Sequence, residues 1–139
     1  LDAFDPTGDP RIRLVAQALM IRLITGDRAA DACQFASLNP HRTLVLKGPQ
    51  TIVANSDHPI SVNGSGNPGL ATAGSGDVLA GLVAGILAGG CDGWNAARLA
   101  VFWHGHAADC AVRCHGEASL TAGILIQSLG AASLDLSRP

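Results

Sequence analysis

Residues 63–76 stand apart from the rest of the sequence, because Gly, Asn, Ser, Pro, Ala and Thr make up nearly all of them and leave almost nothing to bury. Loops of this length inside a compact domain are uncommon and are usually functional. An apolar helix pattern begins directly afterwards at Asp77 and runs to Leu87, where Gly89-Gly90 closes it. Its apolar side chains recur three and four residues apart, which is the spacing of one helix face. The sequence therefore predicts a long functional loop that leads into the start of an apolar helix.

Three small residues, Gly74, Ser75 and Gly76, stand immediately before this predicted helix. The first N–H groups of a helix have no partner within it, and the helix dipole places about half a positive charge there. Because glycine lets an anion approach such amides closely, the junction predicts a phosphate-binding site. It is not a Walker motif, since no Lys-Ser or Lys-Thr pair follows the glycines.

Two roles fit Asp77 at this position. As an N-cap or first-turn acid it would stabilise the helix by about 0.5–2 kcal/mol. A carboxylate beside a bound phosphate is also placed to take the proton from a hydroxyl that attacks the phosphate. The chemistry of the residues leaves the structural cap and the catalytic base open.

Strand patterns are followed by helix patterns along the chain, which indicates the α/β class. The 139 residues suffice for one domain and leave no room for a second. A polar turn at residues 55–58 predicts a hairpin. Helices are expected at residues 12–24, 27–38, 77–87, 95–114 and 121–129, and strands at 43–46, 51–54 and 60–62.

Composition excludes several classes of protein. Hydrophobic residues make up 47% and charged residues 14%, which is the opposite of a disordered chain. The formal net charge is −2 and no basic cluster occurs, so we expect no nucleic-acid partner. No apolar run reaches the roughly 18–20 residues of a membrane span, so we expect no membrane partner. The four cysteines do not have the spacing of a secreted disulfide framework and no secretory signal is visible, so we expect a cytoplasmic protein.

The segment from Asn67 to Asp77 strongly resembles the signature of the NAD(P)H-hydrate dehydratases, a family of the ribokinase-like superfamily. Its Asn-Pro-Gly-Leu-Ala-Thr lead-in is specific to this branch, whereas Gly-x-Gly-Asp alone is a weak motif. Upstream, residues 46–51 are similar to the strand and turn that contact the nucleotide in that family. Downstream, residues 104–109 and 119–122 match its closing helices.

The resemblance covers roughly residues 27–129 and implies a fold and a reaction. The fold would be the C-terminal half of a three-layer α/β/α domain, a single partial ribokinase-like domain over residues 1–139 that lacks the N-terminal half. The reaction would be the ADP-dependent dehydration of hydrated NADH or NADPH, which yields NAD(P)H, AMP and phosphate. ADP would be the phosphoryl donor, and Mg²⁺ would be held mainly by phosphate and water. An NAD(P)H-hydrate epimerase would be the functional or fused partner.

The same resemblance assigns the site residues. Asp77 would be the catalytic base and would contact the substrate together with Asn67. The backbone of Gly74, Ser75 and Gly76 would form an anion hole for the charge of the transferring phosphoryl group. No residue is assigned as a metal ligand. The nucleotide would contact Lys47, Gly48, Pro49, Gln50, Thr51 and Gly76.

Two other functions stay open. One is a small-molecule kinase of the same superfamily, acting on a vitamin or a sugar alcohol. The other is a truncated relative without turnover, because the His-Pro-Gly-Glu element of the family is absent and residues 15–19 occupy about its place. We also expect a homo-oligomer, since half of a parallel sheet would leave one edge and an apolar face exposed.

The longest predicted helix carries two further groups of polar residues. His106, Cys110 and Cys114 follow one another at intervals of four residues on one helix face, an arrangement that zinc can use. We interpret the cysteines as small packed residues, because metal ligands normally arrive from at least two chain segments. We assign His104 and Asp109 to local hydrogen bonds.

Overall fold

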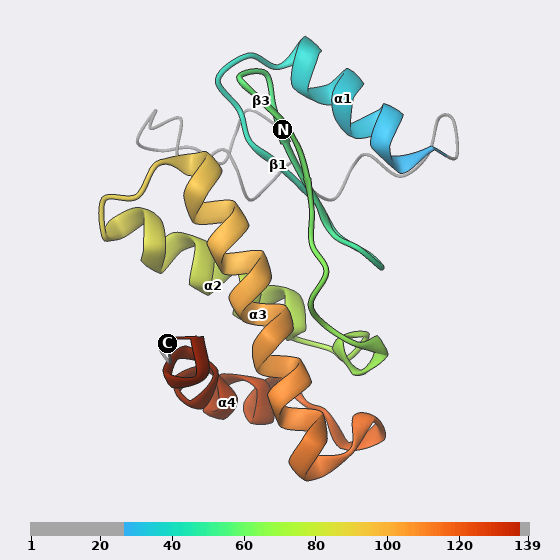
Figure 1. Cartoon of the computed structure of the whole chain (residues 1–139), viewed down its shortest axis with the longest axis vertical. Helices are drawn as coiled ribbons and strands as arrows, with labels where there is room; N and C mark the ends of the chain where they lie inside the picture. The colour runs from blue at the N-terminus through green and yellow to red at the C-terminus, as the bar shows by residue number, and fades with distance from the viewer. Residues whose placement is uncertain (1–26, 137–139) are drawn as a thin grey trace.

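The structure, a computed structural model, describes residues 27–136. The helix predicted for residues 12–24, and with it the segment 15–19, lies outside these residues. Within the described part, the order of elements is that predicted from the sequence: a helix, three strands and three further α-helices (Figure 1). One helix covers one face of the sheet, and the helices that follow the sheet cover the other face.

The first helix, α1 (Arg28–Leu38), has clear signals at both ends. Asp27 is its N-cap, and its carboxylate accepts hydrogen bonds from the N–H groups of Ala29 at 3.0 Å and Ala30 at 3.1 Å. The helix ends before Pro40, because a residue that precedes proline is disfavoured in the helical conformation. The predicted span of residues 27–38 is therefore confirmed.

The sheet has the order β1 (Leu44–Leu46), β2 (Ile52–Asn55) and β3 (His58–Val62), and its neighbouring strands are antiparallel. The predicted hairpin is confirmed, but the expected half of a parallel sheet is wrong for these strands. The reason is the length of the connections. Parallel strands need a crossover of a dozen or more residues, whereas only residues 47–51 and the turn at 56–57 join these strands.

Successive residues of a strand point to opposite sides of the sheet. β1 and most of β2 are buried on both sides, whereas the residues of β3 are exposed or half-buried. One face packs against α1 in an apolar cluster of Ala32, Ala36, Leu44, Leu46, Ile52 and Ala54. The other face packs against the later helices in a cluster of Val45, Val53, Leu79, Val83, Trp94, Ala97, Ala100 and Val101. This layering confirms an α/β fold with helices on both sides of the sheet.

After the sheet, the chain forms three α-helices, α2 (Ser75–Ala88), α3 (Gly93–His115) and α4 (Ala122–Leu136). Two short 3₁₀ helices, η3 (Pro68–Leu70) and η4 (Glu117–Ser119), precede α2 and α4. α2 and α3 contain the predicted helices and extend them slightly at both ends. α4 begins one residue later than predicted and continues well past Leu129, where it was expected to end before Gly130. The helix continues because Ala132 is fully buried in a third apolar cluster with residues of α3. This burial outweighs the roughly 1 kcal/mol that glycine costs inside a helix. None of the helices within residues 27–136 is long and apolar enough to cross a membrane.

Candidate functional site

A cleft of about 650 Å³ lies where the sheet meets the start of α2. Its walls come from the turn after β1, the loop before α2, the first turn of α2 and the middle of α3. No Asp or Glu side chain lines the cleft among the described residues. Seven of the predicted site residues do line it: Lys47, Gly48, Pro49, Gln50, Thr51, Asn67 and Ser75.

Lys47 is the only lysine of the chain and lies at the exposed end of β1. Its Nζ reaches the first turn of α2, since a Cβ added to Gly76 would lie 2.6 Å from this nitrogen. The ammonium therefore lies directly beside the backbone of Gly76, and glycine leaves it the room to do so. Strand end and helix start together form a positively charged corner, which is the arrangement that an anion site needs.

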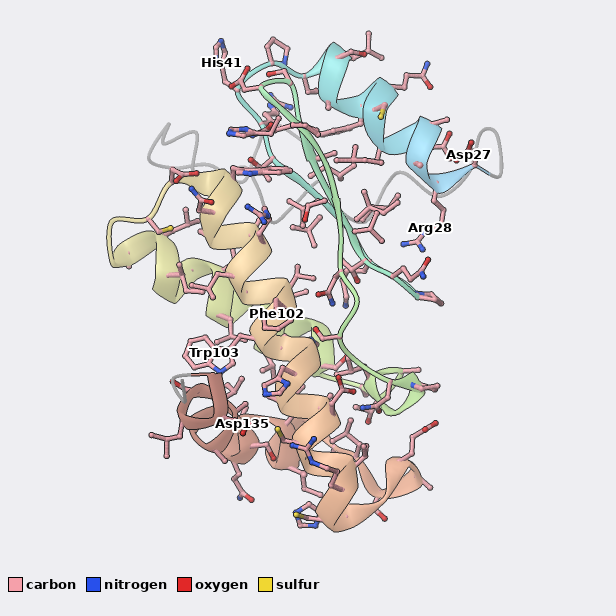
Figure 2. The ribbon with its side chains drawn as sticks, in the orientation of Figure 1. Asp27, Arg28, His41, Phe102, Trp103 and Asp135 are labelled. Atoms are coloured by element: carbon pink, nitrogen blue, oxygen red, sulfur yellow. The ribbon has the colours of Figure 1, made fainter. Side chains whose placement is uncertain are left out.

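Arg28 of α1 stabilises the turn that contains Lys47 through two hydrogen bonds to its backbone. The guanidinium of Arg28 donates to the carbonyl of Leu46 at 3.0 Å and to that of Pro49. Figure 2 shows this side chain at the start of α1, on the side of the strand ends. Gln50 has a positive φ of 53°, which is uncommon for a residue other than glycine and marks a tight turn. Sequence reasoning missed Arg28, because nothing in the sequence near it signals a partner 18 to 21 positions away.

The first turn of α2 leaves a backbone donor free at this corner. Gly74 is the N-cap with a φ of 83° and provides no side-chain capping bond. The N–H groups of Asp77 and Val78 both donate to the Gly74 carbonyl at 3.1 Å, whereas the N–H of Gly76 has no acceptor within residues 27–136. This free N–H and the helix dipole both favour an anion beside Gly76.

His104 of α3 supports the same turn from behind and is only 6% exposed. Its Nε2–H donates to the carbonyl of Ser75 at 2.8 Å, which fixes the tautomer because a carbonyl can only accept. Burial lowers the pKa of His104 from 6.5. The hydrogen bond to the Ser75 carbonyl raises this pKa by less than burial lowers it, and the positive charge of Lys47 lowers it further. The imidazole is therefore neutral and holds the turn without adding charge to the cleft.

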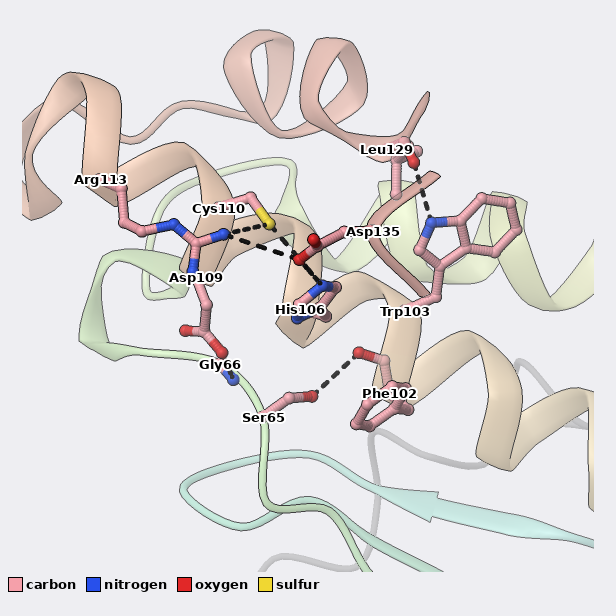
Figure 3. Close-up of polar contacts among 10 residues, drawn as sticks. All are labelled: Ser65, Gly66, Phe102, Trp103, His106, Asp109, Cys110, Arg113, Leu129 and Asp135. Carbon is pink, nitrogen blue, oxygen red and sulfur yellow. Dashed lines mark hydrogen bonds and ion pairs between the residues drawn. The ribbon is translucent and has the colours of Figure 1, made fainter. Parts of the chain in front are cut away.

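Asp109 of α3 fastens the loop before α2 (Figure 3). Its carboxylate accepts from the N–H of Gly66 at 2.8 Å and from Nδ2 of Asn67 at 2.9 Å, while Asn67 Oδ1 accepts from the N–H of Gly69 at 3.1 Å. The assignment of His104 and Asp109 to local hydrogen bonds is therefore wrong, since their partners lie 29 to 43 positions away. The signal in the sequence was their match to the family pattern. Each end of the Asn67 amide is engaged once, which leaves one lone pair and one N–H for a ligand.

Gly105 lets this loop lie directly on α3. A Cβ at this position would lie 2.7 Å from the carbonyl carbon of Ser65 and 2.8 Å from its oxygen. The hydroxyl of Ser65 donates to the Phe102 carbonyl at 2.9 Å, as Figure 3 shows. The loop and the helix are therefore in backbone contact, which fixes one wall of the cleft.

Asp77 lies on the other side of the first turn of α2. Its exposed side chain lines a second hollow of about 730 Å³, together with Gly74 and mainly apolar residues of α2, α3 and α4. The carboxylate makes no hydrogen bond or ion pair within residues 27–136. The structure thus divides the predicted site: Ser75 lines the cleft with the predicted nucleotide turn, Asp77 lines the second hollow, and Gly76 lies between them.

The sequence profile of the NAD(P)H-hydrate dehydratases matches residues 12–129, which is most of the chain. The chain belongs to this family. The bifunctional NAD(P)H-hydrate repair enzyme of Moorella thermoacetica is 42% identical over 106 residues, covering 76% of this chain and 20% of that protein. The ADP-dependent (S)-NAD(P)H-hydrate dehydratase of Neisseria meningitidis is 46% identical over 91 residues, covering 66% of this chain and 30% of that protein.

The fold of the chain also agrees with its membership of the NAD(P)H-hydrate dehydratase family. The structure of the ADP/ATP-dependent NAD(P)H-hydrate dehydratase from Bacillus subtilis, co-crystallised with ATP and Mg²⁺, matches with a TM-score of 0.75 and 32% identity. The match covers 80% of this chain and 40% of the Bacillus chain. The resemblance to the family and its ribokinase-like fold is confirmed, for a chain that spans 20% to 30% of the curated relatives above.

Proposed function

We propose that this chain takes part in the ADP-dependent dehydration of hydrated NADH and NADPH, which yields NAD(P)H, AMP and phosphate. The observation that carries the proposal is the position of the Lys47 ammonium against the backbone of Gly76. It joins the two elements predicted to hold a nucleotide into one cleft. The name of the Neisseria relative, an ADP-dependent dehydratase of the hydrate, supports this reaction over others of the superfamily.

In this proposal the ADP phosphates bind between Lys47 and the start of α2. Lysine holds phosphate as a point charge, and the helix dipole adds to its attraction. Gly76 donates its free N–H, and the N–H of Ser75 is only weakly engaged, 3.4 Å from the Thr72 carbonyl. With Gly74, these residues form the anion hole, and the charge that develops on the transferring phosphoryl group lies against it. Gly48, Pro49, Gln50 and Thr51 contact the rest of the nucleotide.

Asp77 acts from the opposite side of the same turn. The C6 hydroxyl of the hydrated nicotinamide ring gives its proton to the Asp77 carboxylate and attacks the β-phosphorus of ADP, so that AMP leaves. Loss of phosphate from C6, with a proton from the neighbouring ring carbon, then restores the double bond. A carboxylate without a partner in residues 27–136 is free to accept the first proton. Asn67 offers the substrate its remaining lone pair and N–H.

The described residues fit an anion better than a metal ion. Mg²⁺ binds through carboxylates, phosphates and water, and no carboxylate lines the nucleotide cleft among residues 27–136. We therefore propose that Mg²⁺ arrives on the nucleotide phosphates and neutralises their charge, without a cage of described side chains. The Bacillus relative was co-crystallised with ATP and Mg²⁺, which supports this association.

We also propose a cytoplasmic protein that works with an NAD(P)H-hydrate epimerase and associates with itself. The bifunctional name of the Moorella relative supports a second activity alongside dehydration. The four free cysteines suit a reducing compartment. The two edge strands of the described sheet, β1 and β3, support self-association, because an edge strand has N–H and C=O groups that can pair with a strand of another chain.

Nucleotide binding to the 139-residue chain tests the nucleotide site. Lys47→Ala should weaken ADP binding at least about 10-fold in calorimetry, since a hydrogen bond to a charged group contributes roughly 1.5–3 kcal/mol. Arg98→Ala is the matched control, because the Arg98 guanidinium lies over the Trp94 ring and outside the cleft. Since Lys47 is the only lysine, ADP should also protect it from an amine-acetylating reagent. Equal ADP affinities of Lys47→Ala and the parent contradict the nucleotide site.

Turnover separates this reaction from the two other functions. In a chain of full family length, hydrated NADH with ADP should give NADH, followed by its absorbance, and AMP. Phosphorylation of a vitamin or a sugar alcohol by ATP, without dehydration, would identify a kinase instead. ADP binding without either turnover would identify a non-catalytic relative.

A further inference from the structure

The interface of α3 and α4 carries a cluster of metal-ligating side chains that the proposed reaction does not use (Figure 3). His106 and Cys110 lie one turn apart on α3, and Asp135 reaches them from the last turn of α4. One ligand atom of each, a ring nitrogen, the sulfur and a carboxylate oxygen, lies within 4.8 Å of the other two. From the sequence we expected no metal here, because His106 and Cys110 belong to one segment and metal ligands normally come from at least two. Asp135 supplies the second segment.

We propose that His106, Cys110 and Asp135 bind one Zn²⁺ ion, with water as the fourth ligand. Zinc bonds of about 2.3 Å to sulfur and about 2.0–2.2 Å to nitrogen and oxygen place tetrahedral ligand atoms roughly 3.6 Å apart for S and N, and roughly 3.4 Å for N and O. In the structure, Cys110 Sγ lies 3.8 Å from His106 Nε2, and this nitrogen lies 3.1 Å from Asp135 Oδ2. The sulfur of Cys110 and the carboxylate oxygen of Asp135 lie within 4.8 Å of each other, against roughly 3.6 Å in a tetrahedral site. Side-chain rotations would bring the three ligand atoms to these distances.

The donor set selects the metal. A sulfur and an imidazole nitrogen are ligands that zinc prefers, whereas Ca²⁺ and Mg²⁺ require oxygen ligands. A neutral imidazole, a thiolate and a carboxylate together carry two negative charges, which one Zn²⁺ balances. On binding, the Cys110 thiol releases its proton to water, and the proton that His106 holds on Nε2 toward Asp135 moves to Nδ1. This site does not depend on the proposed dehydratase reaction.

Arg113 is the cation that occupies the cluster in the structure. Its Nη2 lies 2.9 Å from Cys110 Sγ and 3.9 Å from Asp135 Oδ2. The Arg113 side chain is 63% exposed, so it can turn into solvent when a metal ion takes its place. Arg113 and Zn²⁺ therefore compete for the same two acidic groups. Removal of the guanidinium should raise the affinity for zinc, which a purely structural polar cluster does not predict.

Co²⁺ alone, and then Zn²⁺ alone, added to the chelator-treated 139-residue chain tests the site. One equivalent of Co²⁺ should give a thiolate-to-cobalt charge-transfer band with the strong visible bands of tetrahedral cobalt, and one equivalent of Zn²⁺ should abolish them. Competition with a coloured chelator then gives the zinc affinity. Loss of an outer hydrogen-bond partner of a metal ligand already costs about 10–100-fold in affinity. Loss of a direct ligand, in Cys110→Ser or Asp135→Asn, should therefore cost at least about 100-fold.

Cys114→Ser is the matched control, because Cys114 lies one turn further along α3 and is exposed. It should keep the cobalt band and the zinc affinity of the parent, while Arg113→Gln should bind zinc more tightly than the parent. Circular dichroism of the metal-free variants identifies any that fail to fold, and Arg113→Gln decides the question in that case, since it leaves all three ligands in place. The proposal is overturned if the parent shows no thiolate band, if Cys110→Ser keeps it, or if Arg113→Gln does not tighten zinc binding.

Discussion

Replacing Gly105 by alanine adds one methyl group at the point where α3 touches the loop before α2. The new Cβ would meet the backbone of Ser65, at 2.7 Å from the carbonyl carbon and 2.8 Å from the oxygen. These atoms belong to the chain itself and cannot rotate away as the end of a flexible side chain could. The loop must therefore move off the helix, and with it one wall of the cleft that we propose for the nucleotide.

Two opposing effects set the size of the change in stability. Alanine is better than glycine inside a helix by about 0.8–1.0 kcal/mol. Overpacking costs about 1–3 kcal/mol. A displaced loop also loses at least one of the two hydrogen bonds that the Asp109 carboxylate accepts from Gly66 and Asn67, each worth about 1.5–3 kcal/mol. The free energy of unfolding should therefore fall by roughly 1.5–5 kcal/mol.

Urea unfolding of Gly105→Ala beside Gly130→Ala measures this effect. Gly130 lies inside α4, and nothing lies within 4 Å of a Cβ added there, so its replacement should stabilise by up to about 1 kcal/mol. Calorimetry should also show that Gly105→Ala weakens ADP binding and that Gly130→Ala does not. If Gly105→Ala proves as stable as Gly130→Ala, the loop is not held by backbone contact with α3, and the account of this wall is refuted.

In a chain of full family length, Asp77→Asn should lower the dehydration rate about 10²–10⁴-fold, because asparagine cannot take the proton. The free energy of unfolding should fall by no more than about 0.3–1 kcal/mol, because Asp77 is a first-turn acid whose carboxylate makes no hydrogen bond within residues 27–136 and loses only its attraction to the helix dipole. Turnover close to the parent rate would make Asp77 a helix-terminal residue only. Because burial lowers the pKa of His104 from 6.5, the unfolded chain binds more protons than the folded chain just below pH 6.5, so this contribution to stability should be complete above that pH and fall as the pH drops toward the lowered pKa. Urea unfolding as a function of pH should show this slope in the parent and a flatter profile in His104→Gln; identical slopes would contradict a buried neutral imidazole.

The helices and the hairpin could be predicted because their signals are local. Asp27 and Pro40 mark the two ends of α1 within the sequence, and the apolar period of α2 needs no partner to be recognised. The end of α4 could not be predicted in this way. Gly130 signals a stop, and only the packing of Ala132 against α3 carries the helix past it.

The antiparallel direction of β1 and β2 could have been predicted from the sequence, although we expected a parallel sheet. The five residues 47–51 between β1 and β2 cannot form a crossover, so an antiparallel pair followed from the sequence itself. The expectation of a parallel sheet came from the way α/β domains are usually built. A count of connecting residues is the stronger argument, because it rests on the reach of the chain.

Seven of the predicted site residues line one cleft, but the separation of Asp77 from that cleft could not be predicted from the sequence. Lys47 and Gly76 lie 29 positions apart, and no periodicity indicates that the ammonium of one reaches the backbone of the other. Asp77 follows Gly76 in the sequence, yet it faces a different hollow. The reason lies in helix geometry. The free N–H groups of the first turn point along the helix axis, out of its N-terminal end, whereas the side chain of a first-turn residue points sideways from the helix. In the proposed reaction, a phosphoryl group on the N–H of Gly76 and a hydroxyl on Asp77 would meet at the N-terminal end of this turn. Asp77 would then contribute to the transfer although it lines the second hollow and not the cleft beside Lys47.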